Sequence, residues 1–171
     1  MRRSRRAWRA LLVVGMVLGL APLVRAHADV TDACGNSTAS GTVRPGCVSY
    51  TFSGSTSTSG RTHRISGELT NCGGDCGPAD PRRGAVTSSV AYPGDPCSSA
   101  DGKATFRVTW ADGTTSIAKA AVRVESGVEH FTGRVTSGVF AHYEFVANIS
   151  SGECDGTHQA SGGAAFSKPG A

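Results

Sequence analysis

The sequence predicts an all-β domain, an antiparallel β-sandwich or flattened barrel of about seven to eight strands that is stapled by disulfides. Three observations support this prediction. After residue 28 no segment shows a helical stripe, and apolar residues alternate with polar ones instead. Gly, Pro, Asp or Ser interrupts the alternation about every ten residues, as turns do. All six cysteines lie in the same region. The immunoglobulin fold is not indicated, because its Cys…Trp…Cys spacing is missing.

The first 28 residues have the layout of an export signal. Five arginines precede an apolar run over 10–21, and Ala26–Ala28 forms a small-x-small cleavage site. The apolar run is too short for a comfortable membrane span. We therefore expect 1–28 to be a cleaved signal peptide and 29–171 to be a single secreted domain. Residues 4–8 also resemble the twin-arginine consensus, so both export routes stay open.

The export signal accounts for the positive charge of the chain. There are 17 Lys and Arg against 13 Asp and Glu, and six of the basic residues but none of the acidic ones lie in 1–28. The domain itself is therefore slightly acidic. Binding to nucleic acid or to an anionic membrane surface requires a basic patch. We expect neither partner.

Alternation along the chain places the strands. The Ser/Thr/Gly-rich stretch 53–60 is predicted to be a flexible loop. The segment 71–83, rich in Gly, Pro and Cys, is predicted to be a rigid irregular excursion. Strands are expected within 48–52, 64–69, 86–92, 104–124 (a hairpin), 131–149 (a second hairpin) and 158–166.

Asp112-Gly113 predicts the first of these hairpins. Asp-Gly suits a two-residue type I′ turn, which would set Trp110 opposite Thr115 and Val108 opposite Ile117. Along the strand that follows this turn, the apolar residues then change from odd-numbered to even-numbered positions. A period-two strand changes face only by inserting a residue, so we expect a bulge near 117–120.

The second hairpin has odd-numbered apolar faces on both sides of Ser137-Gly138. A two-residue loop would pair odd with even residues, so a three-residue loop at 137–139 is expected, with Gly138 in the left-handed conformation. One face would be apolar and the other would be in water. The expected pairs are Phe131–Phe145, Gly133–Tyr143, Thr132–Glu144 and Arg134–His142.

Six cysteines in an exported protein predict three disulfides. Spacing favours the pairs Cys34–Cys47, Cys72–Cys76 and Cys97–Cys154. Each disulfide typically contributes about 2–4 kcal/mol. That is a substantial share of the net stability for a domain whose interior must be built from small residues.

The C-terminal half carries a series of motifs beyond its strand pattern. They are Cys97, the segment Gly102–Ser116, the segment Gly133–Phe140, Cys154 and a Gly-rich terminal strand. Over about 97–166 this series resembles small secreted β-domain proteins of actinobacteria, whose functions are largely unknown. The resemblance implies a β-rich secreted domain and implies no reaction.

Residues with catalytic or metal-binding potential are few. No G-x-S-x-G elbow, H-E-x-x-H helix, phosphate loop or dinucleotide fingerprint occurs, so we predict no catalytic set, no cofactor and no metal. In the expected register His130, His142 and Glu144 share a polar face, but Arg134 beside them opposes a metal ion. Glu129 and Glu144 are the conceivable acid/base pair of a glycosidase, a weak alternative because nothing in the sequence sets their separation.

We expect a secreted, non-catalytic binding or surface-interaction module with an extracellular glycan or protein as ligand. Trp110, Tyr92 and Tyr143 are the aromatics available for ligand contact, although the parity of Trp110 favours the core. One alternative, a carbohydrate-binding module, requires coplanar exposed aromatics. A second, a protease inhibitor, requires a protruding braced loop, for which Cys72–Cys76 and Pro78–Arg83 are the candidates. A third, a small hydrolase, requires a pocket where His meets Ser, Asp or Glu.

Overall fold

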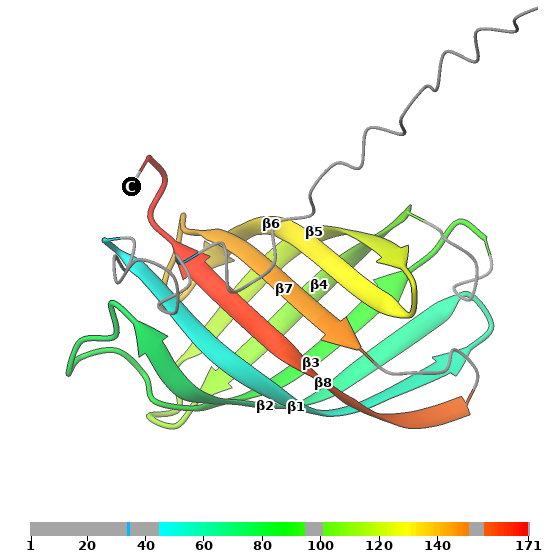
Figure 1. Cartoon of the computed structure of the whole chain (residues 1–171), viewed down its shortest axis with the longest axis horizontal. Helices are drawn as coiled ribbons and strands as arrows, with labels where there is room; N and C mark the ends of the chain where they lie inside the picture. Colours follow the sequence, from blue (N-terminus) through cyan, green and yellow to red (C-terminus); the bar gives the residue numbers. More distant parts are fainter. Residues whose placement is uncertain (1–33, 35–44, 95–100, 151–155, 171) are drawn as a thin grey trace, which may run out of the picture.

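The structure, a computed structural model, describes Cys34 and residues 45–94, 101–150 and 156–170. The described residues form eight antiparallel strands and no helix. Each strand pairs with the next, and the last pairs with the first, so the sheet closes into an up-and-down barrel (Figure 1). The predicted all-β class is confirmed. The strands are β1 (Cys47–Ser59), β2 (Thr62–Gly74), β3 (Gly84–Ala91), β4 (Asp101–Trp110), β5 (Thr115–Glu125), β6 (Val128–Ser137), β7 (Glu144–Ser150) and β8 (Gly156–Ser167).

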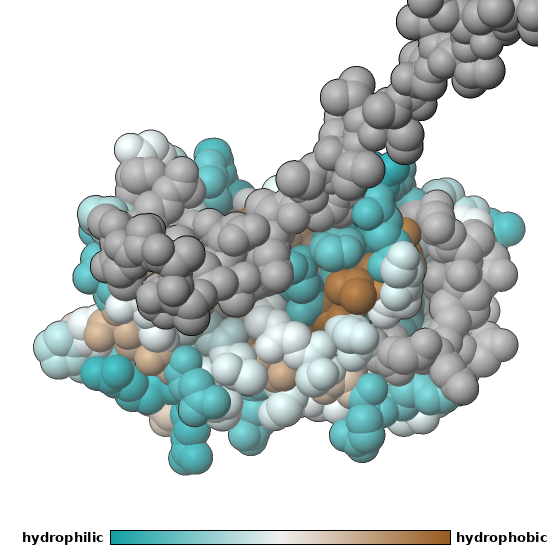
Figure 2. Space-filling model, in the orientation of Figure 1, coloured by the Kyte–Doolittle hydropathy of each residue, from teal (hydrophilic) through white to brown (hydrophobic). Residues whose placement is uncertain are grey.

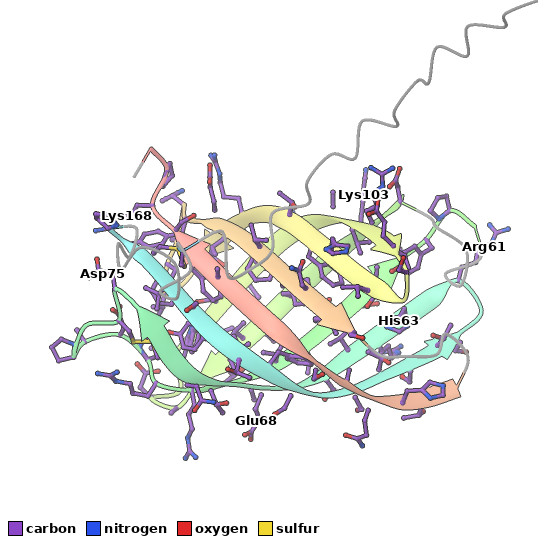
Figure 3. The ribbon with its side chains drawn as sticks, viewed as in Figure 1. Arg61, His63, Glu68, Asp75, Lys103 and Lys168 are labelled. Atoms are coloured by element: carbon purple, nitrogen blue, oxygen red, sulfur yellow. A yellow bond between two sulfur atoms is a disulfide. The ribbon has the colours of Figure 1, made fainter. Side chains whose placement is uncertain are left out.

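The barrel has two ends of different construction. The loop end holds the start of β1, the end of β8 and the connections 75–83, 111–114 and 138–143. The His63 end holds the tight turns at 60–61 and 126–127. In Figure 3, Asp75 and Lys168 mark the loop end, and His63 and Arg61 mark the other end. In the part of the chain that is described, no helix has the length and apolarity to cross a membrane.

Alternate residues of every strand point into the barrel and fill it. Phe106 of β4 lies with its ring centroid 4.9 Å from that of Phe131 and 5.0 Å from that of Phe145. A space of about 10 Å³ remains in the middle of the bore, no larger than one water molecule. Eight strands enclose an interior that side chains can fill, so burial of these rings is the main source of stability. The outer face in Figure 2 is mainly hydrophilic to neutral.

The prediction of a flexible loop at 53–60 is wrong. Residues 53–59 belong to β1, which pairs with β2 on one side and β8 on the other. Gly54 faces Gly67 across the first of these pairings, and a Cβ on Gly54 would lie 2.2 Å from the Ser66 carbonyl oxygen. The glycines therefore permit a close approach of two strands. Composition alone suggested a linker.

The hairpin between β4 and β5 has a three-residue loop, so the two-residue turn is wrong. Trp110 N–H donates to the Thr114 carbonyl (2.8 Å) and closes the loop 111–113, whose glycine has a left-handed φ of 85°. Val108 accordingly pairs with Ser116. The extra loop residue places the even-numbered residues of β5 inside the barrel. The sequence pattern did not reveal it.

The predicted bulge occurs near its expected position, but it lies in the pairing of β5 with β6 and not in that of β4 with β5. Between β4 and β5 the register is continuous, and Ile117 pairs with Arg107. Between β5 and β6 the register shifts at Ile117 and Ala118. β5 does not change faces along its length, because the three-residue loop before it already directs the even-numbered residues of β5 into the barrel.

The hairpin between β6 and β7 has the predicted faces but a different register. β7 begins at Glu144, so the connection 138–143 has six residues and not three. Phe140, with a left-handed φ of 63°, turns its ring into the end of the barrel and makes this longer loop part of the core. The predicted pairs were wrong by two residues. The observed pairs are Phe131–Ala147, Thr132–Val146, Gly133–Phe145 and Arg134–Glu144.

Two of the three predicted disulfides are present. Cys34 is bonded to Cys47, and Cys72 to Cys76, with Cα–Cα distances of 5.2 and 6.0 Å. Cys34 and Cys47 are buried together with Ala165, whose side chain faces away from the bore. Cys34 is thus tied to the outside of β1 and β8. The pair Cys97–Cys154 lies outside the described residues.

Candidate functional site

The loop 75–83 between β2 and β3, hereafter the braced loop, protrudes from the loop end (Figure 1). The Cys72–Cys76 disulfide closes its base. Asp75 ties it to the start of β1 twice: its N–H donates to the Cys47 carbonyl (2.8 Å), and its Oδ2 accepts from the N–H of Gly46 (2.7 Å). The base of the loop therefore has a defined position on the barrel.

Further hydrogen bonds hold the second half of the braced loop. Asp80 Oδ2 accepts from the N–H of Gly77 (2.8 Å), which forms a local turn. The buried Tyr50 hydroxyl donates to the Pro81 carbonyl (2.7 Å). Burial, and secondarily the Asp80 carboxylate, raises the pKa of Tyr50 well above its usual value. The phenol consequently stays protonated and keeps donating to the loop.

Arg82 is one of the exposed residues of the braced loop, as is Arg83 beside it. The carbonyl before it, on Pro81, is held by Tyr50, and the carbonyl after it, on Arg83, accepts from the N–H of Ala111 (3.2 Å). The Arg82 guanidinium donates from Nη1 to Cys76 Sγ (3.6 Å), and sulfur is a weak acceptor. A charged side chain is thus presented on a backbone fixed at both sides.

A surface hollow of about 360 Å³ lies beside this loop. Glu68 and Arg83, which carry opposite charges, line it together with Trp110. Trp110 is otherwise buried, and its Nε1–H donates to Ser116 Oγ (2.8 Å), which donates to the Val139 carbonyl (2.6 Å). The polar atoms of this core region are therefore used within the protein.

The structure buries the aromatics that the sequence offered for ligand contact. Trp110 and Tyr92 are 2 % and 4 % exposed, and Tyr143 is half-buried against Phe140, with ring centroids 5.5 Å apart. The described residues therefore do not include the coplanar exposed pair among these three that a carbohydrate-binding module requires. Trp110 is a core residue, as its parity indicated.

At the other end of the barrel a chain of polar side chains crosses the bore. Thr58 Oγ1 lies 2.8 Å from His63 Nδ1, and His63 Nε2 lies 3.3 Å from Glu129 Oε2. The Tyr92 hydroxyl donates to Glu129 Oε1. His63 is on β2 and Glu129 is on β6, four strands apart in a closed barrel of eight, hence on opposite walls. These side chains link the two walls at this end.

Tyr92 acts in this chain as a hydrogen-bond donor. Burial, followed by the negative charge of Glu129 and the hydrogen bond to it, raises the pKa of Tyr92 far above its usual value. The neutral phenol fixes one oxygen of the carboxylate. The second oxygen is left to face His63.

The polar residues at this end have hydrogen-bonding capacity that the protein does not use. Thr56, His63, Ser88 and Glu129 are 1–7 % exposed. Each has one atom without a hydrogen bond to any described residue. Two of these atoms, His63 Nε2 and Glu129 Oε2, lie within ion-pair distance of each other but do not have the geometry of a hydrogen bond. A buried polar group left unpaired costs about 1–3 kcal/mol. The atoms are Thr56 Oγ1, His63 Nε2, Ser88 Oγ and Glu129 Oε2.

Two groupings considered from the sequence are not formed. Glu129 points into the bore while Glu144 is exposed outside it, so the two carboxylates do not form the acid/base pair of a glycosidase. His142 has a left-handed φ of 73° in the loop before β7, and His130 contacts Asn148 (Nδ1 to Oδ1, 2.9 Å). The expected shared face of His130, His142 and Glu144 therefore does not occur.

The polar chain across the bore was missed by sequence reasoning, although a signal for it existed. Glu129 has the same parity as Phe131, and His63 the same parity as Ile65, which marks both as inward-facing.

Comparisons of the chain with models of protein families, with curated proteins and with solved structures found no match.

Proposed function

We propose that the protein is a secreted, non-catalytic binding module that contacts an extracellular protein through the braced loop. We further propose that this partner is a serine protease that cleaves after arginine. Such proteases place a carboxylate at the bottom of the pocket that receives the substrate side chain. A fixed, exposed arginine on a protruding loop is complementary to that pocket in shape and charge.

The position of Arg82 carries this proposal. Its side chain is exposed, and the carbonyls on both sides of it are hydrogen-bonded to the barrel. A loop that is already ordered loses less conformational entropy when it binds, so more of the contact energy appears as affinity. The Cys72–Cys76 disulfide limits movement of the same segment. Disulfides also favour an extracellular location.

Titration of trypsin with the purified exported protein tests the proposal. Residual amidolytic activity should fall in proportion to added protein. Arg82→Ala should weaken inhibition at least about 30-fold, the loss typical of a dominant contact residue. Arg83→Ala is the matched control and should retain most of the inhibition. Absence of inhibition by the unaltered protein, or equal losses in both variants, would contradict the proposed contact.

The disulfide offers a second test of the same contact. In Cys72→Ala/Cys76→Ala the loop keeps its sequence but loses the covalent closure of its base. We expect this variant to be cut by trypsin after Arg82 rather than to inhibit it, because a mobile loop is released after cleavage. Mass spectrometry of the products would detect the new terminus.

A second candidate, a small hydrolase, is favoured by the order Thr58, His63, Glu129. A hydroxyl, an imidazole and a carboxylate in sequence can activate a nucleophile. Hydrolysis of p-nitrophenyl acetate that falls at least about 100-fold in both Thr58→Ala and His63→Ala would support this candidate. Activity that survives both substitutions would exclude it.

A further inference from the structure

We propose that the polar layer at the His63 end is a binding site for the ammonium group of a small amine. This layer consists of Thr56, His63, Ser88, Tyr92 and Glu129. It lies inside the barrel, at the end opposite the braced loop, and the proposal is independent of any contact with a protease.

Four buried atoms of this layer lack a hydrogen bond, and two of them, His63 Nε2 and Glu129 Oε2, face each other at 3.3 Å. Thr56 Oγ1, His63 Nε2, Ser88 Oγ and Glu129 Oε2 make no hydrogen bond to a described residue. At the loop end, by contrast, Ser116 accepts from Trp110 and donates to Val139, so its capacity is used. Buried polar groups in folded proteins are nearly always paired. The unused capacity therefore points to a bound species at the His63 end.

Three of the unpartnered groups lie on three consecutive strands of the sheet. On β2, Ile65 pairs with Thr56 of β1 and with Ser88 of β3, so both hydroxyl-bearing residues flank it on inward-facing positions. His63 is the next inward-facing residue of β2. Glu129 reaches the same region from the opposite wall, as its contact with His63 shows. The layer therefore surrounds one region of the bore.

Every one of the four atoms can accept a hydrogen bond. The Glu129 carboxylate oxygen only accepts when ionised, and the hydroxyls of Thr56 and Ser88 accept as well as donate. His63 Nε2 accepts in the tautomer whose Nδ1–H donates to Thr58. A group with several donors matches such a set.

The charge of the layer favours a cation among such donors. Glu129 is the one acidic residue among the described buried residues, and none of those residues is Lys or Arg. An ammonium group carries three donors and a positive charge, so it provides donors for such acceptors and compensates the carboxylate. A neutral alcohol provides one donor and no charge.

The surroundings limit the size of the amine. Val90 pairs with His63, and Ile149 pairs with Glu129, so apolar side chains adjoin the polar layer. Farther along the bore the interior is filled, and the space there is about 10 Å³. The alkyl chain of the proposed amine must therefore be short, because a long one would have to enter the filled part of the bore.

Binding of propylamine to the full exported protein, followed by NMR, tests the proposal, with 1-propanol as the neutral probe of matched shape. Propylammonium should shift the side-chain resonances of His63 and bind at least about tenfold more tightly than 1-propanol. Glu129→Gln should remove this preference, while Glu144→Gln, which alters an exposed carboxylate, should leave it intact. Trypsin inhibition should be unchanged in both variants, so the two proposals can fail separately.

A second pair of variants covers the case in which Glu129→Gln does not fold. Ser88→Ala and Thr56→Val keep the carboxylate and should each weaken propylammonium binding about three- to tenfold, the effect of losing one hydrogen bond. Equal affinity for propylamine and 1-propanol would overturn the proposal. So would absence of binding of both probes, which would leave water as the partner of these atoms.

Discussion

The two ends of the barrel bury polar groups in different ways. At the loop end the buried hydroxyl of Tyr50, the indole N–H of Trp110 and the hydroxyl of Ser116 all donate to protein atoms. At the His63 end a carboxylate and an imidazole meet across the bore and retain unused capacity. The loop end is therefore closed inside and offers contacts outside. The His63 end keeps its polar chemistry inside.

The largest loss of stability is expected at the loop end. Trp110→Ala removes a ring that packs on Tyr50, Phe140 and Phe166, with centroids 5.4–6.1 Å away. Truncation of a buried aromatic of this size costs about 3–5 kcal/mol. Urea unfolding should show this loss, whereas Tyr143→Ala, at a half-buried ring, should cost clearly less. Equal losses would mean that the aromatic end is not a single core.

A pair of substitutions would sharpen the contrast at the other end. His63→Leu removes the imidazole that faces Glu129 and leaves the buried carboxylate with the Tyr92 hydroxyl alone among its described contacts. Breaking a buried pair in this way costs about 3–5 kcal/mol. In the double variant His63→Leu/Glu129→Met both polar groups are gone, and most of the stability should return, because an apolar replacement of a buried pair is often neutral. Denaturant unfolding of the three proteins measures this. If the double variant is no more stable than His63→Leu, the lost stability comes from altered packing and not from the unpaired carboxylate.

Much of the fold could be predicted from the sequence, because alternation reports which residues face inward. The shared parity of Phe106, Val108 and Trp110 correctly placed them in one core. Register was harder, since a shift of two residues leaves every face unchanged. The β6–β7 hairpin has such a shift, and only the longer loop 138–143 causes it.

The candidate sites were predictable to different degrees. The Cys72–Cys76 disulfide and most of the excursion that it closes followed from local spacing, but residues 71–74 of the predicted excursion 71–83 belong to β2. The meeting of His63 with Glu129 depends on closure of the barrel, which sets which strands stand opposite each other. Alternation within a strand contains no information on closure. The available signal was a polar residue at a position that alternation assigns to the interior of the barrel.

An intermediate effect is expected at Gly133, where β5 and β6 approach each other closely. A Cβ on Gly133 would lie 2.0 Å from the Lys119 carbonyl oxygen, so Gly133→Ala should push β5 and β6 apart. Overpacking of this kind costs about 1–3 kcal/mol. Thermal unfolding should show the loss, and Gly94→Ala, where a Cβ would meet nothing within 4 Å, is the control. Similar effects of both changes would contradict the close approach.

The smallest effect concerns alkaline pH. The pKa of Tyr92 is raised in the folded protein, so its contribution is fully present below the ordinary tyrosine value of about 10 and is lost as pH rises above it. The free energy of unfolding should therefore fall as the pH rises above about 10, and less steeply in Tyr92→Phe. Tyr143→Phe is the control. Identical slopes for the unaltered protein and Tyr92→Phe would argue against the buried phenol.

Amide hydrogen exchange in the presence of trypsin most directly tests the assignment of the braced loop as the contact surface. A trypsin whose catalytic serine is replaced by alanine would bind without cutting. The account predicts slower exchange within 76–83 and in the neighbouring connection 111–114, with none of this slowing at 58–63. Unchanged exchange in the braced loop, or slowing confined to the His63 end, would contradict it.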